Sequence, residues 1–158
     1  MQIARAQDDD LDRIVGLRLE FLADHRRTST GDDRGVRQES FVAATRRWID
    51  ELMRQGRLHS WIATSEGRDV GLASIIVHDL PPLPEDVRCR DGRLLHVWVE
   101  PPLRGNGLGR ALVQQCLAAA GDLQLRSYSL HATDDGRPLY ERLGFRAEPV
   151  WMERPADR

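Results

Sequence analysis

The sequence predicts one α/β domain in which helices cover a mixed β-sheet. Two strand-like stretches flank a tight turn, which is typical of an antiparallel hairpin. Later strands alternate with helical patterns, which is typical of parallel strands joined by a helix. The chain has 158 residues and 41% hydrophobic side chains, so we expect a single domain over 1–158.

The first part of the chain predicts a strand and two helices. Residues 2–6 form a short strand-like stretch, and the acidic residues 8–10 are suited to the N-terminus of a helix. Apolar residues then recur at spacings of three and four over 11–25, which predicts that helix. A polar, glycine-containing loop is expected at 26–35, and an amphipathic helix at 36–56.

The rest of the chain predicts a hairpin followed by alternating helices and strands. Residues 58–66 and 69–80 flank the turn EGRD and predict the hairpin. The remaining expected elements are a strand at 93–100, a helix at 107–121, a strand at 123–132, a short helix capped by Thr133 or Asp134 and ended by Gly144, and a closing strand at 145–153.

Charge and composition argue against several classes of protein. With 23 basic and 25 acidic side chains the net charge is −2, so no positive field favours nucleic acid or an anionic membrane. We see no signal peptide and no apolar run long enough to span a bilayer, and we expect a soluble cytoplasmic protein. Cys89 and Cys116 lack the spacing of zinc ligands or of a disulfide framework, so no metal is expected.

The stretch EPPLRGNGLGRALVQQC, residues 100–116, places three glycines where a strand leads into a helix. The dinucleotide fingerprint needs its third glycine one position later than Gly109, and the nucleotide P-loop needs a lysine, which this chain lacks altogether. Two interpretations remain open. The segment is either a plain glycine-rich turn or a cradle of backbone amides for a pyrophosphate, with Arg104 adding a positive charge.

Two segments of the chain resemble the GNAT superfamily of acyl-CoA N-acyltransferases. VWVEPPLRGNGLGRALV resembles motif A of that superfamily, whose loop (R/Q)-x-x-G-x-(G/A) is matched by Arg104, Gly107 and Gly109. GRPLYERLGF, residues 136–145, resembles motif B. The N-terminal half matches only in its pattern of elements, and the acceptor specificity of this superfamily usually lies there.

The resemblance implies a fold and a cosubstrate. It implies a mostly antiparallel sheet, splayed between its fourth and fifth strands and flanked by about four helices, with the pantetheine arm of acetyl-CoA entering the gap like an extra strand. Backbone groups of Val97, Trp98 and Val99 would then bind pantetheine and polarise the thioester. The other implied acetyl-CoA-binding residues are Arg104, Gly105, Asn106, Gly107, Leu108, Gly109, Arg110, Thr133 and Tyr140.

Catalysis would need an acid for the departing thiolate and a base for the amine. Tyr140 occupies the motif-B tyrosine position and is the implied general acid. Glu100, at a strand end, and His96, which we expect to share a strand face with Leu94 and Trp98, are the candidate bases acting through water. Tyr128 stands where some members carry a glutamate, and Thr133 replaces a motif-B asparagine, so the base stays open.

We therefore expect an acetyl-CoA-dependent N-acetyltransferase that acts on a primary amine of a small molecule or peptide by direct transfer in a ternary complex. The alternative is a non-catalytic acyl-CoA-binding sensor, and an oxidoreductase of the dinucleotide-binding class is a distant third. The loop at 26–35 and Trp48 could line the acceptor pocket. A homodimer could form through the closing strand at 145–153, which carries Val150 and Trp151.

Overall fold

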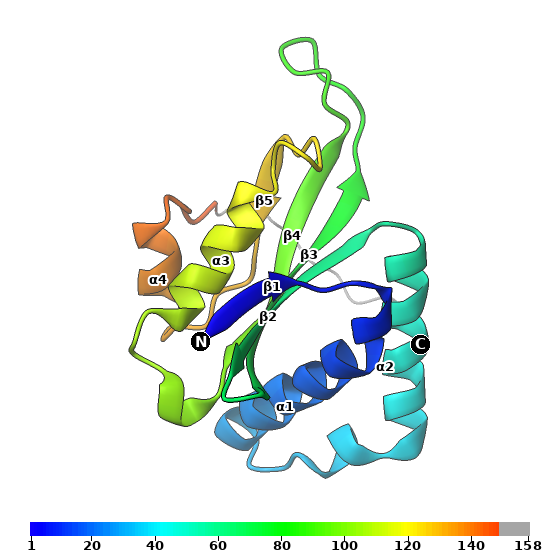
Figure 1. Ribbon diagram of the computed structural model, residues 1–158. Helices are drawn as coiled ribbons and strands as arrows, with labels where there is room; N and C mark the ends of the chain where they lie inside the picture. Colours follow the sequence, from blue (N-terminus) through cyan, green and yellow to red (C-terminus); the bar gives the residue numbers. More distant parts are fainter. Residues whose placement is uncertain (149–158) are drawn as a thin grey trace.

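The computed structural model describes residues 1–148, which form a five-stranded sheet with helices on both faces (Figure 1). The strand order is β1-β2-β3-β4-β5, and every neighbouring pair is antiparallel except β4 and β5, which are parallel. This confirms the predicted mixed, mostly antiparallel sheet. The strands are β1 (Gln2–Arg5), β2 (Leu58–Ser65), β3 (Arg68–Asp79), β4 (Arg90–Val99) and β5 (Ser127–Ser129). The α-helices are α1 (Leu11–Ser29), α2 (Glu39–Arg54), α3 (Leu108–Ala118) and α4 (Arg137–Arg142), and the 3-10 helices are Asp8–Asp10, Arg34–Arg37 and Pro101–Leu103.

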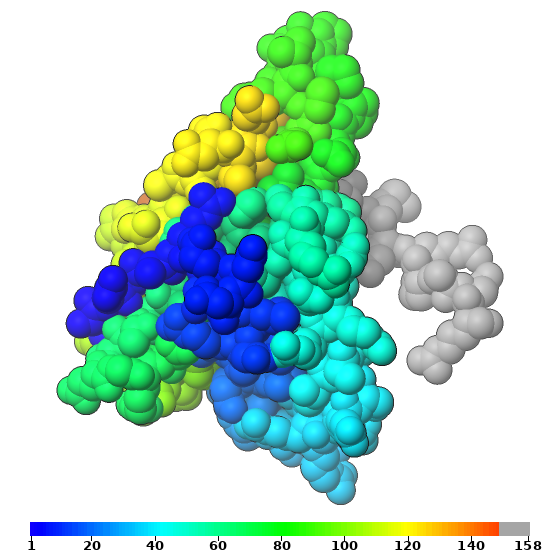
Figure 2. Space-filling view, turned by 45° about the vertical axis from the view of Figure 1, so that its right-hand side comes forward, coloured from blue at the N-terminus to red at the C-terminus, as the bar shows by residue number. Residues whose placement is uncertain are grey.

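The predicted hairpin joins β2 and β3 through a two-residue turn. Ser65 pairs with Arg68, and the residues between them, Glu66 and Gly67, have φ of 51° and 75°. Two successive positive φ values give the turn whose twist matches that of antiparallel strands. At the other end of β3 the segment that leads to β4 projects beyond the sheet (Figures 1 and 2).

The sheet separates two hydrophobic cores because alternate residues of a strand point to opposite faces. On one face, α3 packs through Leu112, Val113 and Cys116 against β2, β3 and β4. On the other face, α1 and α2 pack over the same strands through Ile14 and Ile49, both fully buried. One sheet therefore supports two separate helical layers.

A β-bulge interrupts this alternation in β4. Leu72 pairs with Trp98 but Ser74 pairs with Leu95, so two residues of β4 lie opposite Ala73 alone. His96 at this bulge has φ of 56°. As a result Leu95 and His96 both lie on the α1–α2 face. Leu94 packs into the other core.

The bulge therefore corrects the expectation that Leu94 shares a face with His96 and Trp98. Strict alternation places residues 94, 96 and 98 on one side. One extra residue moves every side chain before it to the opposite side.

Several element bounds also differ from the predicted ones. The first helix continues past His25 to Ser29, because the residue that ends it is Gly31, whose φ is 72° and whose amide donates to the carbonyl of Arg26. The fifth strand is only Ser127–Ser129. The alternating leucines before it, Leu123 and Leu125, are buried in a turn that follows α3.

The end of the chain departs furthest from expectation. Helix α4 does end before Gly144, which has φ of 90°. Residues 145–148 form no strand, and the rest of the expected closing strand lies outside the described residues, with Val150 and Trp151 and the dimer contact proposed for them.

Candidate functional site

The sheet opens between β4 and β5. The two strands pair only over Asp91–Arg93 and Ser127–Ser129, at the start of β4. From Leu94 to Val99 no described strand pairs with β4 on this side. The predicted splay between the fourth and fifth strands is thus present. It leaves an edge of backbone groups that an extended ligand can pair with.

A glycine loop leads from the open end of β4 into α3. Gly105 and Gly107 have φ of 78° and 83°, and Gly107 is the residue that precedes the helix. A Cβ at either position would meet no atom within 4 Å, so backbone conformation and not space requires glycine there. The first amide that donates into the helix is that of Ala111, to the carbonyl of Gly107.

The amides before Ala111 are available for a ligand. Within residues 1–148, no hydrogen bond takes up the backbone N–H groups of Gly105, Asn106, Gly107, Leu108, Gly109 and Arg110. They stand at the positive end of the α3 dipole. Six free donors at a helix N-terminus form a site suited to a phosphate or pyrophosphate group.

Gly109 is helical, and no neighbour among residues 1–148 requires it to be glycine. A Cβ there would lie 3.8 Å from Leu139 and Val99, which is ordinary van der Waals contact. Glycine inside a helix costs about 0.5–1 kcal/mol relative to alanine. A ligand that approaches the main chain closely would account for its presence.

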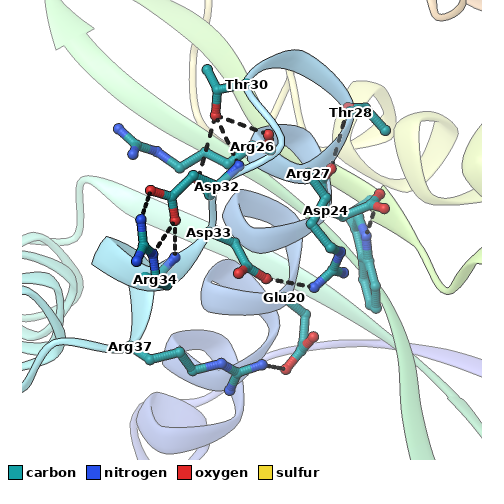
Figure 3. Close-up of polar contacts among 11 residues, drawn as sticks. Glu20, Asp24, Arg26, Arg27, Thr28, Thr30, Asp32, Asp33, Arg34 and Arg37 are labelled. Carbon is teal, nitrogen blue, oxygen red and sulfur yellow. Dashed lines mark hydrogen bonds and ion pairs between the residues drawn. The ribbon is translucent and has the colours of Figure 1, made fainter.

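Arg104 does not project from the loop toward these amides. Its Nε donates to the carbonyl of Val99 at 2.8 Å, and its guanidinium forms an ion pair with Asp24 on α1. Asp24 also accepts a hydrogen bond from the indole of Trp98 at 3.3 Å, and Figure 3 shows this carboxylate among the polar groups of α1. Arg104 thus ties the loop and β4 to α1. The positive charge predicted for the pyrophosphate is already paired.

Tyr140 lies on α4 and packs at the edge of the α3-side core. Its ring meets Phe145 edge-on, with centroids 5.9 Å apart. Burial raises the pKa of Tyr140, so the hydroxyl stays protonated near neutral pH and can act as a donor. Within the described chain this hydroxyl has no hydrogen-bond partner.

Thr133 fixes the turn before α4. Its Oγ1 and its carbonyl both accept from the amide of Gly136, at 3.2 and 3.1 Å. The expectation that Thr133 or Asp134 caps this helix is wrong, because Gly136 is the residue that precedes it, and Thr133 instead holds the turn that leads into it. The hydroxyl predicted to contact acetyl-CoA therefore has a structural partner in this arrangement.

The two candidate bases lie in different environments. Glu100 directly follows β4 and accepts a hydrogen bond from Arg68 at 3.3 Å, in a partly exposed position that water reaches. His96 is buried, with 3% of its surface exposed, and contacts the guanidinium of Arg18 through Nε2. Burial, and then the charge of Arg18, hold the pKa of His96 well below its ordinary value.

The contact with Arg18 assigns the proton on His96. A guanidinium has only donors, so Nε2 must accept and the hydrogen of the neutral ring must sit on Nδ1. The lone pair of His96 is then occupied. In this arrangement Glu100 is the candidate with a free acceptor beside solvent.

Tyr128 and Cys116 lie close together and are both largely buried or hydrogen-bonded. The hydroxyl of Tyr128 donates to the carbonyls of Cys116 and Leu117, both at 3.2 Å, and burial raises its pKa to about 12. Burial likewise raises the pKa of the Cys116 thiol to about 12. Neither group is suited to act as a base or nucleophile near neutral pH.

Residues 1–148 contain neither a cluster of metal ligands nor a membrane-spanning helix. No group of three histidine, cysteine or acidic side chains is placed to hold a metal ion. No helix of this part of the chain is both long enough and apolar enough to cross a membrane.

The fold and the loop agree with a comparison against known protein families. A model described as the acetyltransferase (GNAT) domain matches residues 56–147, more than half of the chain. The chain belongs to the GNAT acetyltransferase family. The match spans β2 to α4, with the glycine loop and Tyr140. Helices α1 and α2 lie outside it.

One curated sequence relative of this GNAT protein has a named activity. It is 35% identical over 86 residues to the glucosamine 6-phosphate N-acetyltransferase of Trypanosoma brucei brucei, and the aligned segment is 54% of this chain and 56% of that relative. The alignment thus spans little more than half of either protein.

Solved structures confirm the GNAT fold. The predicted acetyltransferase of Clostridium acetobutylicum, crystallised with acetyl-CoA, superposes with a TM-score of 0.82 at 23% identity over 98% of this chain and 95% of that one. A GCN5-related N-acetyltransferase from Ralstonia eutropha JMP134 has a TM-score of 0.80 at 24% identity, with 98% and 97% covered.

Two residues that contact the predicted site residues carry no motif signal in the sequence. Asp24 and Arg18 lie on α1, in a segment whose spacing indicates only an amphipathic helix. Their partners, Arg104 and His96, are about 80 residues further along the chain. Contacts over that separation follow from the packing of α1 on β4, which local pattern does not encode.

Proposed function

We propose that this GNAT protein is an acetyl-CoA-dependent N-acetyltransferase that transfers an acetyl group directly to a primary amine of a small molecule or peptide. The observation that carries the proposal is the open edge of β4 beside a loop of six free amides. One structural neighbour was crystallised with acetyl-CoA, and one sequence relative is named for acetylation of glucosamine 6-phosphate. Both support the proposed donor and reaction.

The donor would bind along the splay. Backbone groups of Val97 and Trp98 are proposed to pair with pantetheine as a neighbouring strand would, with Val99 contributing its amide because its carbonyl already accepts from Arg104. The amides of Gly105–Arg110 would hold the pyrophosphate at the N-terminus of α3. A main-chain N–H of β4 that meets the thioester oxygen would stabilise the negative charge that develops there.

Protons would move at two groups. The hydroxyl of Tyr140 is proposed to donate to the sulfur as the C–S bond breaks, which its raised pKa allows. Glu100 is the proposed acceptor of the ammonium proton, through a water molecule, since it is partly exposed at the end of β4. Removal of that proton is needed because an alkylammonium, with a pKa near 10, is not a nucleophile at neutral pH.

The test separates binding from turnover. Acetyl-CoA and CoA are titrated calorimetrically, and melting curves are recorded with each. A ligand at one hundred times its dissociation constant stabilises the fold by about 2.7 kcal/mol. Release of the CoA thiol is then followed with a panel of amines.

The results of this test distinguish an enzyme from an acyl-CoA sensor. Turnover with at least one amine supports the proposal. Tight acetyl-CoA binding with no turnover on any acceptor would favour the acyl-CoA sensor instead. An unchanged melting curve with both ligands would contradict both functions.

A further inference from the structure

Arg18 lies in the middle of α1 and turns toward β4. Its guanidinium sits over the ring of Trp48 on α2, 5.1 Å from the centroid, and contacts His96 on β4. The ring of His96 lies 6.0 Å from Phe21 and 6.1 Å from Trp48. Three elements thus place one cation in a mainly aromatic setting.

The charge of Arg18 is not neutralised by any carboxylate among residues 1–148. The acidic side chains that follow it on α1 are already paired, Glu20 with Arg37 at 2.6 Å and Asp24 with Arg104. Figure 3 shows Glu20 and Arg37 in contact. A guanidinium stays protonated under all ordinary conditions, so this charge persists although burial lowers the pKa of Arg18.

Two buried nitrogen atoms of this group also lack a partner in the described chain. They are Nε of Arg18 and Nδ1 of His96. With Nε2 accepting from Arg18, Nδ1 carries the hydrogen, so both atoms are unsatisfied donors. A buried donor without an acceptor costs about 1–3 kcal/mol. Both donors favour an acceptor with negative charge.

The cluster adjoins the proposed reaction centre. His96 lies at the β-bulge on the α1–α2 face, while the next residue, Val97, belongs to the proposed thioester-binding edge. Trp48, under the guanidinium of Arg18, is 38% exposed, so the cluster reaches the surface at this side chain although its two free donors are buried. A small molecule held by Arg18 would reach the open edge of β4 from the face opposite α3.

We propose that Arg18 binds an anionic group, a carboxylate or a phosphate, of the amine acceptor, and that the enzyme therefore prefers amines with such a group. The inference rests on the proposed function, because it names the class of acceptor for that reaction. An arginine fork matches the two oxygens of either anion, and stacking on Trp48 fixes the plane of the fork.

The experiment uses matched acceptors that differ in one charge. Alanine is compared with alaninamide, and glucosamine 6-phosphate with glucosamine, so that the carboxylate and phosphate sources are tested separately. Binding to CoA-saturated protein is measured by calorimetry, which needs no turnover, and kcat/KM is measured with acetyl-CoA. The variants are Arg18→Gln, Arg18→Lys and, as a control on α2, Arg54→Gln, whose side chain is exposed and paired with Asp50.

We expect the wild type to prefer the charged member of at least one pair by about 10- to 100-fold, as a charged hydrogen bond implies. Arg18→Gln should remove that preference, because it should weaken binding of the charged acceptor and leave binding of the neutral one unchanged. Arg18→Lys should restore part of it, and Arg54→Gln should match the wild type. Acetyl-CoA affinity should be the same in all four proteins.

Two results would overturn the inference while leaving the proposed function intact. One is equal use of charged and neutral acceptors by the wild type. The other is an equal loss of both in Arg18→Gln, which would show that Arg18 only packs against Trp48. If acetyl-CoA does not bind the wild type, the proposed function fails and the inference fails with it.

Discussion

Arg104 and Asp24 form an ion pair that joins the loop before α3 to helix α1. The same arginine donates to Val99, and the same carboxylate accepts from Trp98, so the end of β4 is included. The pair is partly shielded, with 45% and 20% of the two side chains exposed. It therefore connects the proposed donor side of the sheet to the helical layer on its other face.

The first prediction concerns this pair. Asp24→Asn should lower the free energy of unfolding by about 1–2 kcal/mol, because a charged partner is lost while the bond from Trp98 can persist. Acetyl-CoA affinity should also fall, since the loop loses one of its two anchors. Asp33→Asn, at the more exposed pair with Arg27, serves as the control and should cost less than about 1 kcal/mol. Urea unfolding and calorimetry measure both effects, and equal stability of the two variants would contradict the prediction.

The second prediction contrasts two glycines. Gly107→Val should weaken acetyl-CoA binding strongly and also reduce stability by about 1–2 kcal/mol, because φ of 83° is unfavourable for a residue with a branched Cβ. Gly109→Ala should leave stability unchanged or raise it by about 0.5–1 kcal/mol, since the position is helical and has room for a methyl group. Acetyl-CoA affinity of Gly109→Ala should nevertheless fall. Wild-type affinity in this variant would mean that no ligand approaches the backbone there.

The third prediction tests Tyr140. Tyr140→Phe keeps the ring against Phe145 but removes the proposed proton donor. We expect kcat to fall by about 100-fold, the low end for general-acid assistance, because a thiolate is already a fair leaving group. Affinity for acetyl-CoA should change little, since the interaction belongs to the transition state. Undiminished turnover would reduce Tyr140 to a packing residue.

The fourth prediction concerns stability at mildly acidic pH. Burial lowers the pKa of His96 and of His59 below the ordinary value of 6.5, so the unfolded chain binds these protons more readily than the folded one. Stability should be complete above about pH 6.5 and fall as the pH drops toward about 5, by at most about 1.4 kcal/mol per pH unit for each histidine. The carboxylates with lowered pKa values, such as Asp69, add their own dependence only in more acidic solution.

A variant isolates the contribution of His96. Asparagine tolerates the φ of 56° at this position, so His96→Asn should keep the bulge and make the pH slope shallower. His78→Gln on β3 is the matched control. Urea unfolding at several pH values measures the pH dependence of the free energy of unfolding for each variant. A slope that His96→Asn does not change would show that this side chain is not buried as a neutral ring.

Much of the proposed donor side could be predicted because its signals are local. The turn at Glu66 and Gly67 and the glycine loop are marked by their own residues, and Gly67, Gly105 and Gly107 all have positive φ. The splay of the sheet came from resemblance to a family and is present in the structure. The turn and the loop, unlike the splay, depend on residues that are close in sequence.

The contacts that define the other face could not be predicted in this way. A bulge at His96 puts Leu94 on the opposite face from His96 and Trp98, and no propensity at that position marks the extra residue. The pairing of Arg104 with Asp24 depends on how α1 crosses β4, as does the contact of Arg18 with His96. The buried leucines at 123 and 125 alternate as in a strand, yet they fill a turn below α3.

The two cores on opposite faces of the sheet have a consequence for how this chain can change over evolutionary time. Side chains that face α3 and those that face α1 and α2 alternate along the same strands, so each set can be exchanged with little repacking of the other. Mutations that reshape the layer of α1 and α2 can therefore accumulate while the glycine loop stays intact. A gene duplicate could acquire a new acceptor in this way and inherit its donor chemistry unaltered.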